Sequence, residues 1–362
     1  MSNIYSVWFQ QLNLSEYVKK QLLLMIGDYK KIFDSNYDTY LEWGLSPKAS
    51  TILIKHKINI ESCSKIIDRC NIEGIKIIDF YHKQYPWLLR EIPDSPIILY
   101  VKGNENLLSE PMIAIVGARH CSEYGQQYAM HFGKKLAEYG VCVVSGMALG
   151  IDGAAHIGAL QTGTTIGILG TGVNICYPSS NHKIYREILQ KGCLVSEYPP
   201  DTLARPYHFP KRNRIISGMS YGIVVIEAAI KSGSLITAQL AMDYAREVYA
   251  LPGNINSRLS EGTNALIRTG AICITSVEDI IEEMPDGLCI KNKMTHKNRN
   301  KLDNELAKAE MLVYANVSQE PIMFQKILER TQLSYERINT SLLQLEVKGL
   351  IQRLPGERYV RI

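Results

Sequence analysis

The segment Phe209–Gly218 combines an aromatic residue with several cations at close spacing. No Asp or Glu occurs between Thr202 and Ile226, so these cations have no acidic partner nearby in the sequence. A ring among unpaired cations supplies what a single-stranded nucleic acid needs: a flat face for a base and positive charge for the phosphate backbone. An ordinary basic surface loop is the alternative interpretation. The candidate residues of this stretch are Arg205, Phe209, Lys211, Arg212, Asn213 and Arg214.

Turns rich in small residues follow four apolar segments of the sequence. Glycine lets the backbone approach a ligand closely, and consecutive N–H groups can form an anion-binding nest. One turn, Ser232-Gly233-Ser234, precedes a stretch of helical periodicity whose free N–H groups could hold a phosphate. We expect the four turns to meet at one edge of a sheet and to form an elongated groove for several phosphates. The candidate residues in them are Gly117, Arg119, Ser145, Gly146, Gly170, Gly172, Ser232, Gly233 and Ser234.

The sequence contains no recognisable catalytic or cofactor motif. Gly146, Gly150 and Gly153 are spaced G-x3-G-x2-G rather than G-x-G-x-x-G, and the phosphate-loop pattern G-x4-G-K-[ST] does not occur. No serine, cysteine or lysine stands in a nucleophile elbow, and no set of His, Cys, Asp or Glu residues has metal-ligand spacing. We therefore expect no catalysis, no cofactor and no metal.

Four ionisable residues lie close to the turns. Asp152 is expected to cap a helix that begins at Gly153, and His156 is expected to be structural. Glu197 and Glu227 follow apolar runs that predict strands, where an acid could activate water. An enzyme that acts on a nucleotide or a nucleotide sugar is therefore the alternative function.

The elements that must position these residues divide the chain. Residues 1–78 have helical periodicity and predict a small helical domain. Residues 79–285 alternate short apolar runs with helical stretches, which predicts a parallel sheet covered by helices on both faces. Ligands of such sheets bind beyond the carboxyl ends of the strands, where the turns fall. The expected strands are 113–116, 141–144, 165–169, 193–195, 223–226, 248–251 and 272–274, and the expected helices include 126–139, 153–160 and 237–246.

The last part of the chain predicts a separate domain. Residues 286–304 are polar and rich in lysine, which indicates a linker. Residues 305–362 show helical patterns at 305–315, 322–329 and 334–348, then two short strands around Pro355-Gly356. Three helices and a hairpin are the layout of a winged helix-turn-helix. Its third helix carries a balanced set of charges, which favours contact with a partner over strong duplex binding: Glu336, Arg337, Glu346 and Lys348.

The overall composition is that of a globular protein with two or three domains, since 46% of the 362 residues are hydrophobic. The net charge is only +4, so a nucleic acid must meet a local basic patch. The eight cysteines include no C-x-x-C pair, and Cys142 and Cys273 lie in apolar runs, which predicts buried thiols in a reducing compartment. No signal pattern and no membrane-spanning apolar run is found, so we expect a cytoplasmic protein without a membrane partner.

From Tyr85 to about Ile281 the sequence resembles the DNA-processing protein A (DprA/Smf) family. The most specific motifs are Phe-Pro-x-Arg-Asn-Arg-Ile-Ile-Ser-Gly at Phe209–Gly218 and Ser-Gly-Ser-Leu-Ile-Thr-Ala at Ser232–Ala238. The resemblance extends through Val116-Gly117-Ala118-Arg119, Ser145–Asp152, Tyr177-Pro178 and Gly262–Ile267.

This resemblance implies an extended Rossmann-like domain that binds single-stranded DNA and forms a homodimer. A sterile-alpha-motif-like or helix-hairpin-helix-like domain would precede it and a winged-helix domain would follow. The family implies a non-catalytic protein that loads RecA recombinase onto incoming single strands in natural transformation and recombination, beside single-strand-binding protein. By motif, Arg119 would contact a phosphate and Phe209 would stack on a base. Arg212 and Arg214 would belong to the basic segment and partly shape it.

Overall fold

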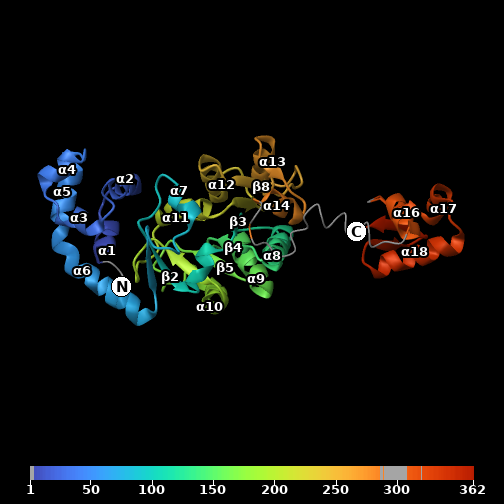
Figure 1. The fold of residues 1–362 in the computed structure, drawn as a ribbon, viewed down its shortest axis with the longest axis horizontal. Coiled ribbons are helices and arrows are strands. Elements are labelled where there is room, and N and C mark those ends of the chain that lie inside the picture. Colours follow the sequence, from blue (N-terminus) through green and yellow to red (C-terminus); the bar gives the residue numbers. More distant parts are fainter. Residues whose placement is uncertain (1–3, 286–287, 289–307, 319) are drawn as a thin grey trace. The chain divides into compact units, whose positions relative to one another are not determined.

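The computed structural model describes residues 4–285, 288, 308–318 and 320–362. The chain divides into two compact units, residues 1–291 and 292–362, and each is described by itself (Figure 1). The larger unit contains both the N-terminal helices and the central sheet. The predicted linker at 286–304 lies outside the described residues, apart from Leu288.

The first part of the larger unit is helical, as the periodicity of residues 1–78 predicts. Polar residues mark where its helices begin: the Oγ atoms of Ser15 and Ser46 accept hydrogen bonds from the N–H groups of Val18 and Ala49, both at 3.3 Å. The helices are α1 (Ile4–Gln11), α2 (Glu16–Ile26), α3 (Tyr29–Asp34), α4 (Tyr37–Glu42), α5 (Pro47–His56), η1 (Lys57–Asn59) and α6 (Ile60–Glu73).

The central sheet of the larger unit has the strand order β1-β2-β6-β5-β4-β3-β7-β8-β9. Strands β3 to β9 pair in parallel, whereas β2 runs antiparallel to both β1 and β6. The seven strands predicted from apolar runs are confirmed, and β1 and β2 at one end of the sheet were missed. The strands are β1 (Lys76–Asp79), β2 (Ile98–Gly103), β3 (Met112–Val116), β4 (Cys142–Ser145), β5 (Thr165–Ile168), β6 (Cys193–Ser196), β7 (Gly222–Val225), β8 (Glu247–Ala250) and β9 (Ile272–Cys273).

Helices cover both faces of this sheet, as predicted. Side chains alternate along a strand, so Ile113 and Ile115 of β3 pack into one apolar cluster with α8, α9 and α14, while Ala114 and Val116 pack into the other with α11 and α12. The remaining helices of this unit are α7 (Trp87–Glu91), η2 (Glu105–Ser109), α8 (Glu123–Glu138), α9 (Ile151–Thr162), η3 (Ser179–Asn181), α10 (His182–Lys191), α11 (His208–Met219), α12 (Gly233–Asp243), α13 (Glu261–Arg268) and α14 (Glu278–Glu283).

The smaller unit has helices and a three-stranded sheet in the order β10-β12-β11. The predicted hairpin is confirmed as β11 (Ile351–Leu354) and β12 (Arg358–Arg361). The helix predicted to begin at 322 begins two residues later, because Ile322 and Met323 pair with β12 as β10. Its helices are α16 (Lys308–Asn316), α17 (Phe324–Thr331) and α18 (Tyr335–Val347). Positions 305–307 of the first predicted helix lie outside the described residues.

The prediction of buried thiols is correct for Cys142 and wrong for Cys273, which is exposed. Cys273 belongs to β9, a strand of two residues at the edge of the sheet, where one side has no neighbouring strand to cover it. Over the part of the chain that is described, no helix is both long and apolar enough to cross a bilayer.

Candidate nucleic-acid interface

A cavity of about 420 Å³ opens where the loops after β3, β4 and β7 meet α11 and α12. These three strands are parallel, so their carboxyl ends lie at the same edge of the sheet. The volume falls within the range of small-ligand sites. The lining residues are Val116, Gly117, Ala118, Arg119, His120, Ala148, Asp152, Phe209, Pro210, Arg212, Asn213, Ile216, Ala229, Lys231, Ser232, Gly233, Ser234, Ile236, Thr237 and Leu259.

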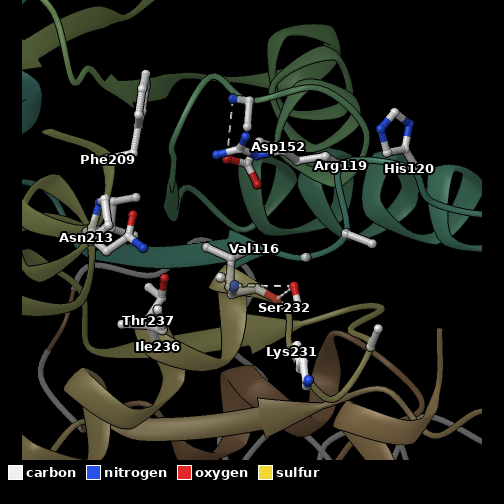
Figure 2. Close-up of a pocket in the computed structure, with 18 of the residues that line it drawn as sticks. Val116, Arg119, His120, Asp152, Phe209, Asn213, Lys231, Ser232, Ile236 and Thr237 are labelled. Carbon is white, nitrogen blue, oxygen red and sulfur yellow. Dashed lines mark hydrogen bonds between the residues drawn. The ribbon is translucent and has the colours of Figure 1, made fainter. Parts of the chain in front are cut away.

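The segment with the ring and the cations forms helix α11 rather than a surface loop. Phe209, Asn213 and Ile216 are spaced by four and three residues, so they share the side of the helix that lines the cavity. Figure 2 shows Phe209 and Asn213 on one side of this cavity and Ser232 and Thr237 of the α12 region below them. Residues of the two motifs Phe209–Gly218 and Ser232–Ala238 therefore line the same cavity.

The Phe209 ring is half-buried and contacts groups from two other loops. The Arg119 guanidinium carbon lies 5.9 Å from the centroid of the ring, and the Tyr177 ring lies 5.3 Å away at an angle of 34°. A Cβ atom on Gly170 would lie 3.1 Å from Phe209 Cδ1, so glycine leaves room for the ring at that point. These contacts hold an aromatic face at the mouth of the cavity.

The N-terminus of α12 lies on the opposite side of the cavity. Ser232 caps the helix: its Oγ accepts a hydrogen bond from Ser234 N at 3.4 Å and lies 2.7 Å from Ser234 Oγ. A Cβ atom added to Gly233 would meet nothing within 4 Å, so space in front of the helix is open. The backbone N–H groups of a first turn lack partners within the helix and favour anions. This end of α12 has the features of a phosphate site.

The loop after β3 supplies exposed positive charge. Arg119 and His120 are exposed there, and Lys231 is exposed beside the α12 terminus. Among the described residues, no ion pair involves Arg119 or Lys231. Gly117 permits this loop to pack closely, because a Cβ atom would lie 2.6 Å from Ile151 Cγ1. The free cations of the site are therefore Arg119 and Lys231.

The expectation that Lys211 and Arg214 have no acidic partner is wrong. Arg214 is 4% exposed and pairs with Glu197, and Lys211 Nζ lies 3.0 Å from Glu197 Oε2 and 3.2 Å from Glu16 Oε1. The absence of acids between positions 202 and 226 excludes only local partners, and the folded chain brings acids from elsewhere.

Arg212 is likewise 4% exposed. Its Nη1 donates to the backbone oxygens of Gly146 and Ile168, so it ties α11 to the loop after β4 and to the end of β5. Burial lowers the pKa of Arg212 to about 10, and nearby Asp152 opposes this shift. Arg212 therefore remains charged at neutral pH, and it is one of the residues that line the cavity.

Asp152 does not cap a helix that begins at Gly153. Helix α9 begins at Ile151 with Gly150 as its N-cap residue. The Asp152 carboxylate instead accepts hydrogen bonds from the N–H groups of Gly146 (3.1 Å) and Ala148 (3.4 Å), and so shapes the loop after β4. Burial raises the pKa of Asp152, and Arg212 opposes the rise.

The other ionisable candidates have structural partners. His156 is fully buried, with Nδ1 2.7 Å from Thr165 Oγ1, and burial followed by the charge of Arg212 lowers its pKa to about 3. Glu227 accepts hydrogen bonds from the N–H and hydroxyl groups of Ser122. Within the described ranges, no cluster of His, Cys, Asp and Glu residues could hold a metal ion.

Several predicted site residues lie outside the cavity. Ser145 is buried and donates its hydroxyl proton to Ile115 O at 2.6 Å. Gly172 N donates to Thr202 O at 2.9 Å, and Arg205 is exposed with its Nη1 2.9 Å from the Tyr207 hydroxyl. The predicted residues that line the cavity are Gly117, Arg119, Phe209, Arg212, Asn213, Ser232, Gly233 and Ser234.

Sequence reasoning missed Lys231, His120 and Thr237 as lining residues. Lys231 precedes the Ser232-Gly233-Ser234 turn directly, and His120 follows Arg119, so adjacency to a predicted turn was the available signal. Thr237 lies one helical turn beyond Gly233, which helical spacing also predicts. Tyr177 gave no such signal, because its contact with Phe209 joins segments 32 residues apart.

A mostly parallel sheet that is covered by helices on both faces defines a Rossmann-like protein. The cavity at its strand ends, with amide donors and free cations, is its candidate anion site. The chain belongs to the DNA recombination-mediator protein A family, whose model matches residues 76–285. The model of the DprA winged helix domain matches residues 298–357. These matches confirm both the predicted resemblance and the predicted fold class.

Named relatives agree with this assignment. Protein Smf of Escherichia coli is 41% identical over 285 residues, which cover 77% of this chain and 75% of that protein. DNA processing protein DprA of Bacillus subtilis is 43% identical over 216 residues, which cover 59% of this chain and 73% of that protein.

Solved structures agree as well. The X-ray structure of DprA from Streptococcus pneumoniae superposes with a TM-score of 0.69 at 33% identity, over 78% of this chain and 99% of that chain. DprA of Helicobacter pylori, whose structure was described for its single-stranded DNA binding mode, gives 0.52 at 33% identity, over 57% of this chain and 94% of that chain.

Proposed function

We propose that this protein binds single-stranded DNA in the cavity between α11 and α12 and acts without catalysis. The observation that carries the proposal is the meeting of a half-exposed aromatic ring, two free cations and an open helix N-terminus at one edge of the sheet. Phe209 would stack on a base, and Arg119, Lys231 and the first turn of α12 would hold phosphates. None of these contacts reads a base edge, so binding would have little sequence preference.

We further propose that the protein works as a homodimer in the cytoplasm and loads RecA onto incoming single strands beside single-strand-binding protein. This part rests on membership of the family. The domain boundaries 1–78, 79–285, 286–304 and 305–362 remain predictions. No observation favours the alternative, an enzyme acting on a nucleotide or nucleotide sugar, because both candidate acids, Glu197 and Glu227, have structural partners.

The sharpest test of the DNA site places a negative charge where a phosphate would bind. Gly233→Asp fits sterically, because nothing lies within 4 Å of the added Cβ, and an acid in the first turn suits a helix. We expect this variant to lose most of its affinity for a labelled single-stranded oligonucleotide in fluorescence anisotropy. Gly233→Asn is the matched control and should bind much better. Equal affinity of the two variants would place the DNA elsewhere.

RecA loading needs its own assay. Single-stranded DNA is first covered with single-strand-binding protein, and RecA filament formation is followed by ATP hydrolysis with and without this protein. We expect the wild type to shorten the lag before ATP hydrolysis begins, and we expect Gly233→Asp to leave this lag unchanged. A wild type that binds DNA tightly yet leaves the lag unchanged would remove RecA from the proposal and keep the DNA site.

A further inference from the structure

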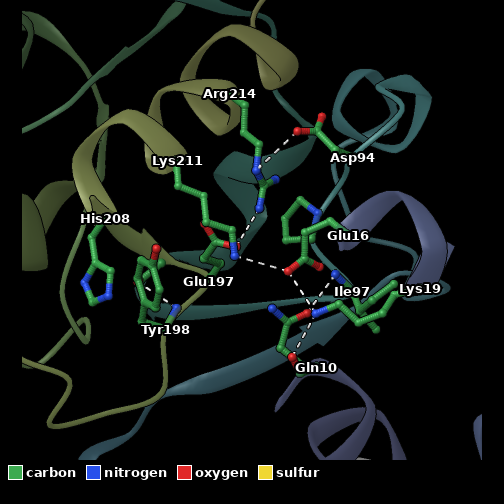
Figure 3. A network of polar contacts seen from close by, with 12 residues as sticks. Gln10, Glu16, Lys19, Asp94, Ile97, Glu197, Tyr198, His208, Lys211 and Arg214 are labelled. Atoms are coloured by element: carbon green, nitrogen blue, oxygen red, sulfur yellow. Dashed lines mark hydrogen bonds and ion pairs between the residues drawn. The ribbon is translucent and has the colours of Figure 1, made fainter. Parts of the chain in front are cut away.

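A buried ion network joins the N-terminal helices to the DNA-facing helix α11 (Figure 3). We call it the α2–α11 network. Glu16 at the start of α2 accepts from Lys19 Nζ at 2.8 Å and from Lys211 Nζ at 3.2 Å. Lys211 and Arg214 of α11 both reach Glu197, which follows β6, and Arg214 Nε lies 3.7 Å from Asp94 Oδ2. Its members are Glu16, Lys19, Asp94, Glu197, Lys211 and Arg214.

Most of the α2–α11 network is removed from water. The side chains of Lys19, Glu16, Glu197 and Arg214 are 2%, 6%, 1% and 4% exposed, whereas Lys211 is 40% exposed. Burial alone would raise the pKa of Glu16, but Lys19, Lys211 and Arg214 hold it below its ordinary value. The network brings three carboxyl groups, Glu16, Asp94 and Glu197, together with three basic side chains, Lys19, Lys211 and Arg214, so their formal charges balance.

This arrangement is a poor way to gain stability. Apolar side chains of similar volume often stabilise a core as well as a buried ion pair does. Glu16 Oε2, Glu197 Oε1 and Arg214 Nη1 also have no hydrogen-bond partner among the described residues. The ion pairs instead fix the relative positions of the segments that carry them, since each cation must lie beside its acidic partners.

The element whose geometry they define is the first half of α11. Lys211 is two residues from Phe209 and two from Asn213, and the two sets point to different sides of the helix: Phe209 and Asn213 line the DNA cavity, while Lys211 and Arg214 line a second hollow together with Glu16. Glu16 itself is held in place, because Lys19 also donates to Gln10 O at 2.9 Å. Gln10 in turn accepts from Ile97 N at 3.0 Å, just before β2.

We propose that Glu16 is a positioning residue for DNA binding: through Lys211 it holds the first half of α11 where Phe209 and Asn213 face the strand. The N-terminal helical region is then a working part of the DNA groove. This inference rests on the proposed function. It also means that Lys211 is occupied by two carboxylates and neutralises no phosphate.

A double-mutant cycle tests the link. Glu16→Gln and Lys211→Met each remove one charge and keep most of the shape, and Asp34→Asn is the control, because Asp34 forms an exposed pair with Lys30 on α3 in the same region. We expect each single variant to bind a single-stranded oligonucleotide about tenfold more weakly. The double variant should lose clearly less than the two single losses combined, since both variants remove the Glu16–Lys211 pair. The slope of log affinity against log salt should stay at the wild-type value in all of them, because no phosphate contact is lost.

Two results would overturn the proposal. If Lys211 binds phosphate and Glu16 only competes for it, Glu16→Gln will tighten binding, and Lys211→Met will flatten the salt slope. If Glu16 matters only for folding, the two single effects will add, or affinity will follow thermal stability.

Amide hydrogen exchange gives a readout that needs no DNA. In Glu16→Gln, residues 209–213 should exchange faster than in the wild type, while α12 and the Asp34→Asn control should not change. Exchange that rises across the whole unit, or nowhere, contradicts the proposal. If the wild type fails to bind single-stranded DNA, the proposed function fails, and this measurement still decides whether Glu16 positions α11.

Discussion

The two sides of helix α11 differ in the residues that they carry and in the contacts that these residues make. One side presents Phe209 and Asn213 to an open cavity, where Arg119 and Lys231 supply free charge. The other side sends Lys211 and Arg214 into a buried network with acids from α2 and from the end of β6. Lys211, Arg212 and Arg214 are thus tied to other groups of the protein, and the free cations that line the cavity come from other loops. A cluster of positive charge in a sequence therefore does not show which of its cations are free to contact a ligand.

The largest effect is expected where a buried charge loses its partner. Arg214→Met leaves Glu197 buried beside Lys211 alone, and we expect the free energy of unfolding in urea at pH 7 to fall by about 3–5 kcal/mol. Arg205→Met is the control on an exposed site and should change stability by less than about 0.5 kcal/mol. An Arg214→Met protein of normal stability with a flattened salt slope for DNA would move Arg214 to the cavity side.

The ring on the cavity side gives the next largest effect. Phe209→Ala should weaken binding of a single-stranded oligonucleotide by about 1–3 kcal/mol, because it removes a stacking face. Tyr207 is an exposed ring two residues away that does not line the cavity, so Tyr207→Ala should bind nearly as well as the wild type. Anisotropy titrations of the two variants compare them directly. If Tyr207→Ala lost more affinity than Phe209→Ala, the base would stack on Tyr207 instead of Phe209.

The free cations on the cavity side should control the salt dependence. Each phosphate neutralised on a single strand contributes a log–log slope of about 0.7, so Arg119→Gln combined with Lys231→Gln should lower the slope by about 1.4. Lys211→Gln should leave it unchanged, because its ammonium group is already paired. Titrations at four salt concentrations measure both. If Lys211→Gln lowered the slope and the Arg119→Gln, Lys231→Gln variant did not, Lys211 would be the cation that binds phosphate.

The last prediction concerns His156, a buried residue of α9 whose pKa is affected by the charge of Arg212. Burial and then the charge of Arg212 lower the pKa of His156 to about 3, while the unfolded state protonates near 6.5. The unfolded chain therefore binds the extra proton, and stability falls as pH drops from 6.5, by up to about 1.4 kcal/mol per pH unit. Urea unfolding between pH 7 and pH 5 should show a smaller loss in His156→Gln than in the wild type. Equal losses would mean that His156 is protonated in the folded state.

Much of the fold follows from patterns within single segments. Runs such as 113–116 and 223–226 are apolar and short, and a parallel sheet buried on both faces requires that texture. The strands β1 and β2 were missed, although β2 is as apolar as the predicted strands. Both pair antiparallel, and antiparallel strands do not require the alternation of strand and helix from which the other strands were predicted. The hairpin of β11 and β12 and the helix α18 of the smaller unit were predicted closely, because Ser334, Gly349 and Pro355-Gly356 mark their ends locally.

The candidate site was predictable in place but only partly in detail. Gly233 and Phe209 belong to motifs whose local chemistry, an amide-rich turn and an aromatic among cations, indicates the ligand class without a structure. Tyr177 and the acid Glu16 could not be found in this way, because their partners lie 32 and 195 residues away along the chain.

By itself the sequence determined the succession of strands and helices, the turns at their ends and the family to which the chain belongs, because these depend on neighbours a few residues apart. Only the tertiary structure decided which cations are free. Charge accessibility depends on whether a distant acid arrives beside a given lysine or arginine, and folding brought Glu16 and Glu197 to Lys211 and Arg214 while leaving Arg119 and Lys231 open to solvent. Pairing of buried charges is a property of the assembled chain, and no local pattern records it.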